Sequence, residues 1–275
     1  MKGYELLDSG LGKKLERFGS YILERPCAQA VWKPSQSLQT WKQAHLAFSR
    51  HPEERWDKRQ KIPQDWIIEV EEVLLKIAPT DFGHVGFFPE HARFFSPMCQ
   101  KVKKESHILN LFAYTGAASL YLAKKEMQVC HLDASKTTVA WAKENAQHNS
   151  IDSIRWIIDD ALKFLQREQK RGRKYQGILM DPPTYGRGFQ GEIFKIEEHL
   201  PLLIELCSSL LDMDSPGFFL LTCHTPGYTP LVLQNLLAQN LLFRKKGGKI
   251  ELGEMQIESS VNLPAGSFIF WSWNG

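Results

Sequence analysis

Two stretches of the chain decide its fold: ILNLFAYTGAASL at residues 108–120 and YQGILMDPPTYGRG at residues 175–188. Each begins as a short apolar run typical of a buried strand, and each then stops at a turn. The first turn contains a glycine, which lets the backbone approach a ligand closely, and the second contains two successive prolines. The two stretches therefore predict a sheet with a ligand pocket at the ends of its strands.

From residue 107 onward, short apolar runs alternate with segments of helical pattern. Strands are expected at HILNLF, QVCHLD, IRWII, YQGILMD and GFFLLTC. Helices are expected near residues 116–126, 136–149, 160–170, 192–213 and 228–239, and the segments LLFRKKGGKIEL and SFIFWSW predict a closing strand pair. This alternation predicts an α/β fold with a mostly parallel, doubly wound sheet and a closing antiparallel strand. Ligands bind such sheets at the C-terminal ends of the strands.

The first 80 residues have a different pattern, in which short strands are joined by glycine turns. We expect a small β-rich N-terminal domain over residues 1–80 and a ligand-binding domain over residues 81–275. Four of the eight tryptophans fall in the first part: Trp32, Trp41, Trp56 and Trp66. Interleaved with Lys and Arg, they suit either the stacking of unpaired bases or the filling of a small core.

Composition limits the class of protein. The hydrophobic fraction of 43% and the charged fraction of 24% are ordinary for a globular protein, and no apolar run suits a membrane span or a signal peptide. The five cysteines form no C-x-x-C pair, which predicts reduced thiols, a cytoplasmic location and no zinc ribbon. The net charge is +3, and the first 65 residues carry 12 Lys and Arg against 8 Asp and Glu.

Acidic residues follow the second and third strands of the expected sheet. Asp133, with Ala134 and Ser135 after it, stands where a carboxylate can accept both ribose hydroxyls of an adenosine. Asp160, before Ala161, stands where an acid can accept the exocyclic amine of adenine. Each also suits a helix cap, since Asp and Ser are frequent at helix N-termini. The turn Phe112–Gly116 lacks G-x-G-x-x-G, so the dinucleotide fingerprint is absent.

The turn after the fourth strand reads Asp181-Pro182-Pro183-Thr184-Tyr185-Gly186. The prolines fix the backbone and remove two N–H donors. The carbonyls and the Asp181 carboxylate are then acceptors that suit the amine edge of a base. Tyr185 is expected to stack on the face of that base. A structural cis-proline turn is the alternative. After the fifth strand, Cys223 suits a thiolate nucleophile whose pKa His224 lowers, or else an ordinary core residue.

With these motifs in place, the chain resembles a class I, Rossmann-like, S-adenosylmethionine-dependent methyltransferase. More closely, it is similar to the bacterial 23S ribosomal RNA methyltransferases of the cytosine-C5 type and their guanine-methylating relatives. LNLFAYTGAASL resembles their cofactor loop, HLDAS their ribose acid, IIDDALKFL their adenine-contacting acid, and RGRKYQGILMDPPTYGRG their Asp-Pro-Pro turn. DSGLGKKLERFGSYILERP resembles the small β-rich domain that precedes the catalytic one.

The chain departs from this family in three places. The family adds an N-terminal RNA-binding PUA domain, and this sequence begins after the point where that domain would end. Where the family has G-x-F-L-D-x-R, the chain has GFFPEH at 86–91, with Arg93 displaced. The cytosine enzymes place their nucleophile two residues beyond Cys223, where this chain has Thr225. That shift favours methylation of a base nitrogen over 5-methylcytosine chemistry.

The resemblance and the motifs together imply the site residues. The cofactor-binding residues are expected to be Phe88, Glu90, His91, Arg93, Phe112, Ala113, Tyr114, Thr115, Gly116, Asp133, Ala134, Ser135, Asp160, Ala161 and Asp181. The catalytic residues are expected among Asp181, Pro182, Tyr185 and Cys223, with no metal.

The resemblance implies an enzyme that methylates ribosomal RNA, with S-adenosylmethionine as cofactor, S-adenosylhomocysteine as product, and no membrane partner. A small-molecule or protein acceptor is the second hypothesis, and a non-catalytic, cofactor-binding ribosome-assembly factor is the third. A nicotinamide dehydrogenase is disfavoured because the glycine pattern that such enzymes need is absent.

Overall fold

A computed structural model of the protein describes residues 2–50, 55–188, 191–240 and 247–275. The chain forms two compact units, one of residues 1–92 and 256–265 and the other of residues 93–255 and 266–275. The domain boundary expected at residues 80 and 81 stays a prediction, since compactness alone does not test separate folding. Residues 241–246, where the expected closing strand pair begins, lie outside the described residues.

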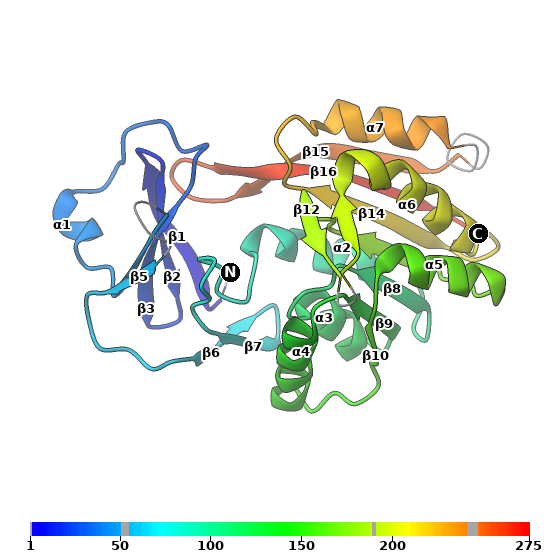
Figure 1. The fold of residues 1–275 in the computed structure, drawn as a ribbon, viewed down its shortest axis with the longest axis horizontal. Helices are drawn as coiled ribbons and strands as arrows, with labels where there is room; N and C mark the ends of the chain where they lie inside the picture. The colour runs from blue at the N-terminus through cyan, green and yellow to red at the C-terminus, as the bar shows by residue number, and fades with distance from the viewer. Residues whose placement is uncertain (1, 51–54, 189–190, 241–246) are drawn as a thin grey trace. The chain divides into compact units, whose positions relative to one another are not determined.

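The second unit is built on a seven-stranded sheet (Figure 1). Its order is β10-β9-β8-β11-β14-β16-β15. The strands are β8 (His107–Leu111), β9 (Gln128–Asp133), β10 (Arg155–Ile158), β11 (Gly177–Met180), β14 (Gly217–Cys223), β15 (Lys249–Ile257) and β16 (Leu263–Trp273). Every strand expected from the apolar runs is present, and the predicted α/β architecture is confirmed.

The register of the sheet is parallel from β10 to β14 and reverses at β16. Ile108 faces Val129 of β9 and Gly177 of β11, so β8 has a parallel partner on each side. Strand β16 runs antiparallel to β14, with Trp273 opposite Gly217. All four residues of β11 and all seven of β14 are buried, as expected for parallel strands covered on both faces.

Helices cover both faces of this sheet (Figure 1). They are α2 (Phe95–Cys99), α3 (Ala117–Lys124), α4 (Lys136–His148), α5 (Ala161–Lys170), α6 (Ile196–Leu210) and α7 (Pro230–Gln239). Apolar residues of α5, α6 and α7 share one buried cluster with β8, β9, β11 and β14, whereas α3 and α4 pack on β9. None of the helices in the described parts of the chain is long and apolar enough to cross a bilayer.

The first unit contains two sheets. A five-stranded sheet runs in the order β1-β2-β3-β4-β5, and β6 pairs with β7 in a separate hairpin. Its elements are β1 (Tyr4–Gly10), β2 (Lys13–Phe18), β3 (Tyr21–Pro26), α1 (Leu38–Trp41), β4 (Leu46–Ser49), β5 (Arg55–Lys58), β6 (Trp66–Val70) and β7 (Val73–Ile77). The boundary with the second unit falls within the 3-10 helix η1 (Pro89–Phe94). The β-rich character expected of this part of the chain is confirmed.

The four tryptophans of this unit donate their indole N–H groups inward. Trp32 donates to the Ser9 carbonyl at 2.9 Å, and Trp41 donates to the Asp8 carboxylate at 2.8 Å. The other two donate to backbone carbonyls at 2.8 and 2.9 Å. Buried indole N–H groups need such partners. These bonds fix the four rings in place. Only Trp41 is buried, so core filling and base stacking both stay predictions for this unit.

One element differs from expectation. The helix expected from residue 192 begins at Ile196, and a two-stranded hairpin precedes it, with β12 (Tyr185–Arg187) paired to β13 (Ile193–Lys195). The sequence pattern did not predict this hairpin, because strands of three residues are too short to show a period of two.

Candidate active site

The turns that follow β8, β9, β10 and β11 lie at one edge of the sheet, because these strands are parallel. The chain leaves β8 toward α3 and leaves β11 toward the β12–β13 hairpin, on either side of the point where the strand order reverses. Crevices at such reversal points are where doubly wound sheets bind ligands. The carboxyl edge of β8 and β11 is therefore the candidate active site.

The turn after β8 has an unusual backbone. Phe112, Tyr114 and Gly116 have φ values of 55°, 51° and 88°, in the left-handed region that only glycine enters readily. A Cβ on Gly116 would lie 3.1 Å from the Cβ of Ala142 in α4, so this glycine also permits close packing. Left-handed non-glycine residues cost free energy and gather at functional sites, so this turn is a candidate ligand cradle.

Asp133, at the end of β9, fixes this turn. Its Oδ2 accepts from the backbone N–H of Tyr114 at 2.9 Å. Its Oδ1 accepts from the Ser135 N–H at 2.9 Å and from the Thr138 hydroxyl at 3.1 Å. A carboxylate has about four lone-pair positions. These bonds occupy three of them, and the fourth is on Oδ2, beside the turn.

The helix caps that were the alternative interpretation are also present. Ser135 caps α4, accepting from the Thr138 N–H, and Asp160 caps α5, accepting from the Lys163 N–H at 2.9 Å. The cap uses Oδ1 of Asp160, so it is compatible with a ligand contact through the other carboxylate oxygen. Ala134 is half-buried and Ala161 is buried, and both lie at the same edge of the sheet.

Asp181 follows β11, and residues at the end of β14 contact it. The Thr222 hydroxyl donates to Asp181 Oδ1 at 2.7 Å, and Nε2 of His224 lies 3.4 Å from the same oxygen. The side chain of Asp181 is 26% exposed, so the carboxylate reaches solvent while Thr222 restricts its rotation. Thr222, which the sequence analysis did not select, is thus a positioning residue for Asp181.

The β12–β13 hairpin presents an exposed aromatic ring beside the Asp-Pro-Pro turn. Tyr185 is 51% exposed, and its hydroxyl accepts from Nε of Arg187 at 3.2 Å. Pro182 is buried, and the Thr184 hydroxyl lies 2.7 Å from that of Thr225. The hairpin therefore holds a ring and a cation at the rim of the edge where the predicted catalytic residues meet.

Cys223 does not resemble an activated nucleophile. It is the last residue of β14 and is 1% exposed. Burial raises the pKa of its thiol, which supports the core-residue interpretation over a thiolate whose pKa His224 lowers. A buried thiol with a raised pKa is mostly protonated at neutral pH and is inert.

Four of the residues expected to bind the cofactor are divided between the units. Phe88, Glu90 and His91 belong to the first unit, and Arg93 begins the second. Arg93 is exposed, and its guanidinium lies over the rings of Phe94 and Phe268, with 5.0 Å to the centroid of the latter. The role of these four residues in cofactor binding stays a prediction.

A buried polar network supports the turn after β8. The Asn110 amide donates to the Ser119 hydroxyl at 2.9 Å, and that hydroxyl lies 3.0 Å from Nδ1 of His131, linking β8, α3 and β9. Burial lowers the pKa of His131 to about 3, a shift that a backbone contact with Tyr114 partly opposes. The sequence feature that points to this network is a polar residue within each of two apolar strand runs, Asn110 in HILNLF and His131 in QVCHLD.

The strand order and the edge described above define a Rossmann-like class I fold. A crystal structure of an S-adenosylmethionine-dependent methyltransferase from Agrobacterium tumefaciens is 34% identical to this chain, with a TM-score of 0.93 over 98% of this chain and 90% of that one. A candidate S-adenosylmethionine-dependent methyltransferase from Streptococcus mutans, 16% identical, has the same fold, with a TM-score of 0.77 over 99% and 75% of the two chains. The chain belongs to the S-adenosylmethionine-dependent methyltransferases.

Two further comparisons cover less of the molecule. Residues 91–205 match the family described as "Conserved hypothetical protein 95". The "Ribosomal RNA large subunit methyltransferase K/L" of Pseudoalteromonas atlantica is 37% identical over 112 residues, which is 40% of this chain and 15% of that protein. The chain thus spans a small part of the length of the curated relatives that it matches.

The buried His131 predicts a pH dependence of stability. Its pKa is below that of an unfolded histidine, near 6.5, so the unfolded chain binds the extra proton and stability falls as the pH drops from 6.5 toward 3. Between pH 7 and pH 5 the wild type should lose about 2 kcal/mol more than His131→Gln, measured by urea unfolding. The control is His148→Gln at an exposed position of α4, which should keep the wild-type pH dependence. Equal pH dependence of His131→Gln and wild type would contradict the assignment.

Proposed function

We propose that the protein transfers a methyl group from S-adenosylmethionine to a base nitrogen of ribosomal RNA. The observation that carries the proposal is the Asp181-Pro182-Pro183-Thr184 turn at the carboxyl end of β11, with its carboxylate held by Thr222 and the exposed Tyr185 ring beside it. Partial identity to ribosomal RNA methyltransferases supports RNA as the substrate. The edge of the sheet that holds these residues is the same edge that carries the β8 turn.

The residues at this edge fit an adenosine group. In the proposal, the fourth lone pair of Asp133 accepts from a ribose hydroxyl, since the other three already hold the turn and the helix start. The left-handed turn Phe112–Gly116 brings backbone close to the cofactor, and Asp160 and Ala161 serve the adenine edge. This assignment gives Asp133 one ribose contact in place of the two that the sequence suggested.

The chain's own contribution to the reaction is placement. When bound, the cofactor supplies a methyl group that its sulfonium centre activates, because the thioether that remains is a good leaving group. Asp181 and the Pro182 carbonyl orient the N–H edge of the base so that its nitrogen lone pair faces that methyl, and Tyr185 stacks on the ring. Holding the two partners in line at near-attack distance removes much of the entropic barrier. The nitrogen gains the methyl group and S-adenosylhomocysteine is the product that leaves. The carboxylate of Asp181, hydrogen-bonded to the N–H, accepts the proton that the methylated nitrogen loses and passes it to solvent.

The proposal is tested with methyl-labelled S-adenosylmethionine, the purified protein, and ribosomal subunits and total RNA from a strain lacking the gene. We expect label in ribosomal RNA, and digestion to nucleosides should give an N-methylated base. Label confined to protein or small-molecule fractions would favour those acceptors instead. Cofactor binding without transfer to any fraction would favour the assembly-factor hypothesis.

Asp133→Asn should weaken binding of S-adenosylhomocysteine by about 1–3 kcal/mol, because one charged acceptor at the ribose is lost. The measurement is isothermal titration calorimetry, with circular dichroism to verify folding. Asp152→Asn is the matched control, since this aspartate is exposed in the loop before β10, and it should bind as the wild type does. Unchanged affinity in Asp133→Asn would remove Asp133 from the cofactor site.

Cys223→Ala should retain transfer to within about twofold, because a buried, protonated thiol does not take part in nitrogen methylation. Cys207→Ala is the control for the stability lost by truncating a buried cysteine, since Cys207 is fully buried in α6. Abolished transfer by a folded Cys223→Ala protein, with Cys207→Ala active, would establish the cytosine-C5 mechanism instead.

A further inference from the structure

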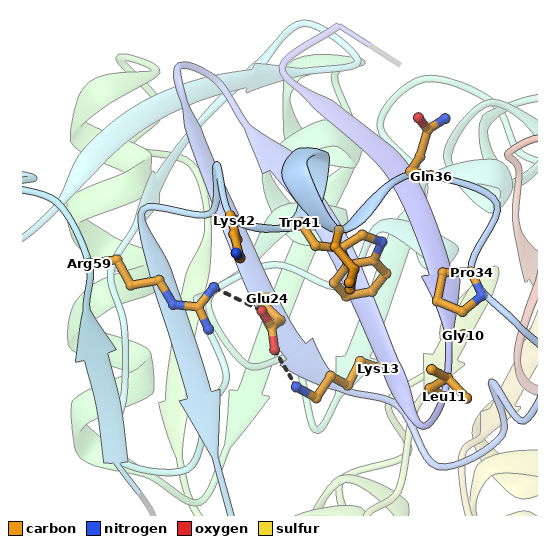
Figure 2. A pocket seen from close by; sticks show the side chains of 10 residues that line it. Gly10, Leu11, Lys13, Glu24, Pro34, Gln36, Trp41, Lys42 and Arg59 are labelled. Carbon is orange, nitrogen blue, oxygen red and sulfur yellow. Dashed lines mark hydrogen bonds and ion pairs between the residues drawn. The ribbon is translucent and has the colours of Figure 1, made fainter.

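The first unit contains a pocket of its own. The pocket has a volume of about 640 Å³ and lies at the turn between β1 and β2 (Figure 2). Its walls come from this turn, from β3, from the segment that follows β5, and from α1 with the loop before it. A second pocket, also of about 640 Å³, shares Leu11, Lys13, Glu24 and Arg59 with the first. Both volumes are within the range of ligand sites.

Buried hydrogen bonds hold the loop wall of the first pocket in place. The Asp8 carboxylate, 3% exposed, accepts from the N–H groups of Ser35 and Gln36 at 3.1 and 2.8 Å. It also accepts from the Trp41 indole at 2.8 Å, and Trp41 lines the pocket. One carboxylate thus fixes both the loop and α1, so the pocket is formed before any ligand arrives.

The lining includes two leucines that the unit itself does not bury. Leu11 is 69% exposed and Leu38 is 81% exposed, and both line the first pocket. Leu11 also has a φ of 51°, a left-handed conformation that is costly for leucine. Exposed apolar side chains gathered in a preformed hollow suit a ligand with an apolar face.

The walls of the two pockets are cationic. Lys13 and Arg59 share the Glu24 carboxylate, at 2.6 and 3.0 Å (Figure 2). Lys42 and Arg50 are exposed and have no ion pair within the described ranges. Together the walls hold five cations, Lys13, Lys14, Lys42, Arg50 and Arg59, against the carboxylates of Glu24 and Asp57. Lys14 also pairs with the buried Glu16 at 3.1 Å, and Arg59 lies 3.5 Å from Asp57, so the cations without an ion pair in the described ranges are Lys42 and Arg50.

We infer that the two pockets bind a single-stranded segment of the RNA substrate. Bases contact the apolar lining at Leu11 and Leu38, while phosphates meet Lys42 and Arg50. Two adjoining pockets with a shared cationic wall suit successive units of an anionic chain better than one small molecule. The inference rests on the proposed function, because it takes the occupant to be the RNA that is methylated.

The test measures fluorescence anisotropy of fluorescein-labelled oligouridylate and of labelled ribosomal RNA fragments across a salt series. Lys42→Glu/Arg50→Glu should weaken binding by about tenfold or more and reduce the salt slope by about 1.4, as expected for two lost phosphate contacts on a single strand. Leu38→Ser, at an exposed site, should weaken binding while leaving the salt slope unchanged, because no charge is altered.

The matched control is Lys2→Glu/Arg17→Glu, which makes the same change in charge at the other end of the β1–β2 hairpin. Both residues form exposed ion pairs, with Glu69 and Glu5, which contribute little to stability. This control should bind RNA with nearly the wild-type affinity and slope. An equal loss of RNA affinity in the control and in Lys42→Glu/Arg50→Glu would indicate that net charge alone sets the affinity, and would contradict RNA binding in the pockets.

The methyl-transfer assay separates the two proposals. If the wild type labels ribosomal RNA but the pocket variants bind RNA as it does, the pocket inference fails and the proposed function stands. If the wild type neither binds nor labels RNA, both fail. Labelling by the wild type together with weakened binding in Lys42→Glu/Arg50→Glu and Leu38→Ser supports both.

Discussion

The parallel pairing of β8 with β9 on one side and β11 on the other is the constraint on which the site depends. Together with the parallel pairs of β10 with β9 and of β14 with β11, it brings the carboxyl ends of five strands to one edge, while the chain turns away in different directions after β8 and β11. Such a reversal of strand order is the place where doubly wound sheets bind ligands. Asp133, Asp160 and Asp181 lie at that edge because each one ends or closely follows a parallel strand.

Asp133 stabilises the backbone at this edge and is also the proposed ribose-binding residue. Its carboxylate holds the left-handed turn after β8 through Tyr114 and the start of α4 through Ser135. Below the same turn, the Asn110, Ser119 and His131 side chains form a buried network. A buried, neutral histidine is costly to protonate, so the network keeps its hydrogen bonds at neutral pH. The same residues that stabilise the turn therefore preorganise it for a ligand.

The α/β fold was predictable from the sequence because buried parallel strands are continuous apolar runs that stand out from amphipathic helices. The ends of those strands were equally visible, which is why Asp133, Asp160 and Asp181 were selected. The β12–β13 hairpin was not predictable, since its strands are too short for a periodic signal. Thr222 was missed because a threonine within GFFLLTC resembles any strand residue, and its bond to Asp181 links positions 41 residues apart. The pocket of the first unit depends on Asp8 bonding residues 27 to 33 positions away, which no local pattern reveals.

The central claim is that the cofactor binds at the carboxyl edge of β8 to β11. Amide hydrogen exchange with and without S-adenosylhomocysteine tests it most directly. The account predicts slowed exchange in residues 112–116, 133–135 and 159–161, where backbone N–H groups line this edge. Slowed exchange confined to other segments, with these three turns exchanging as in the free protein, would contradict it.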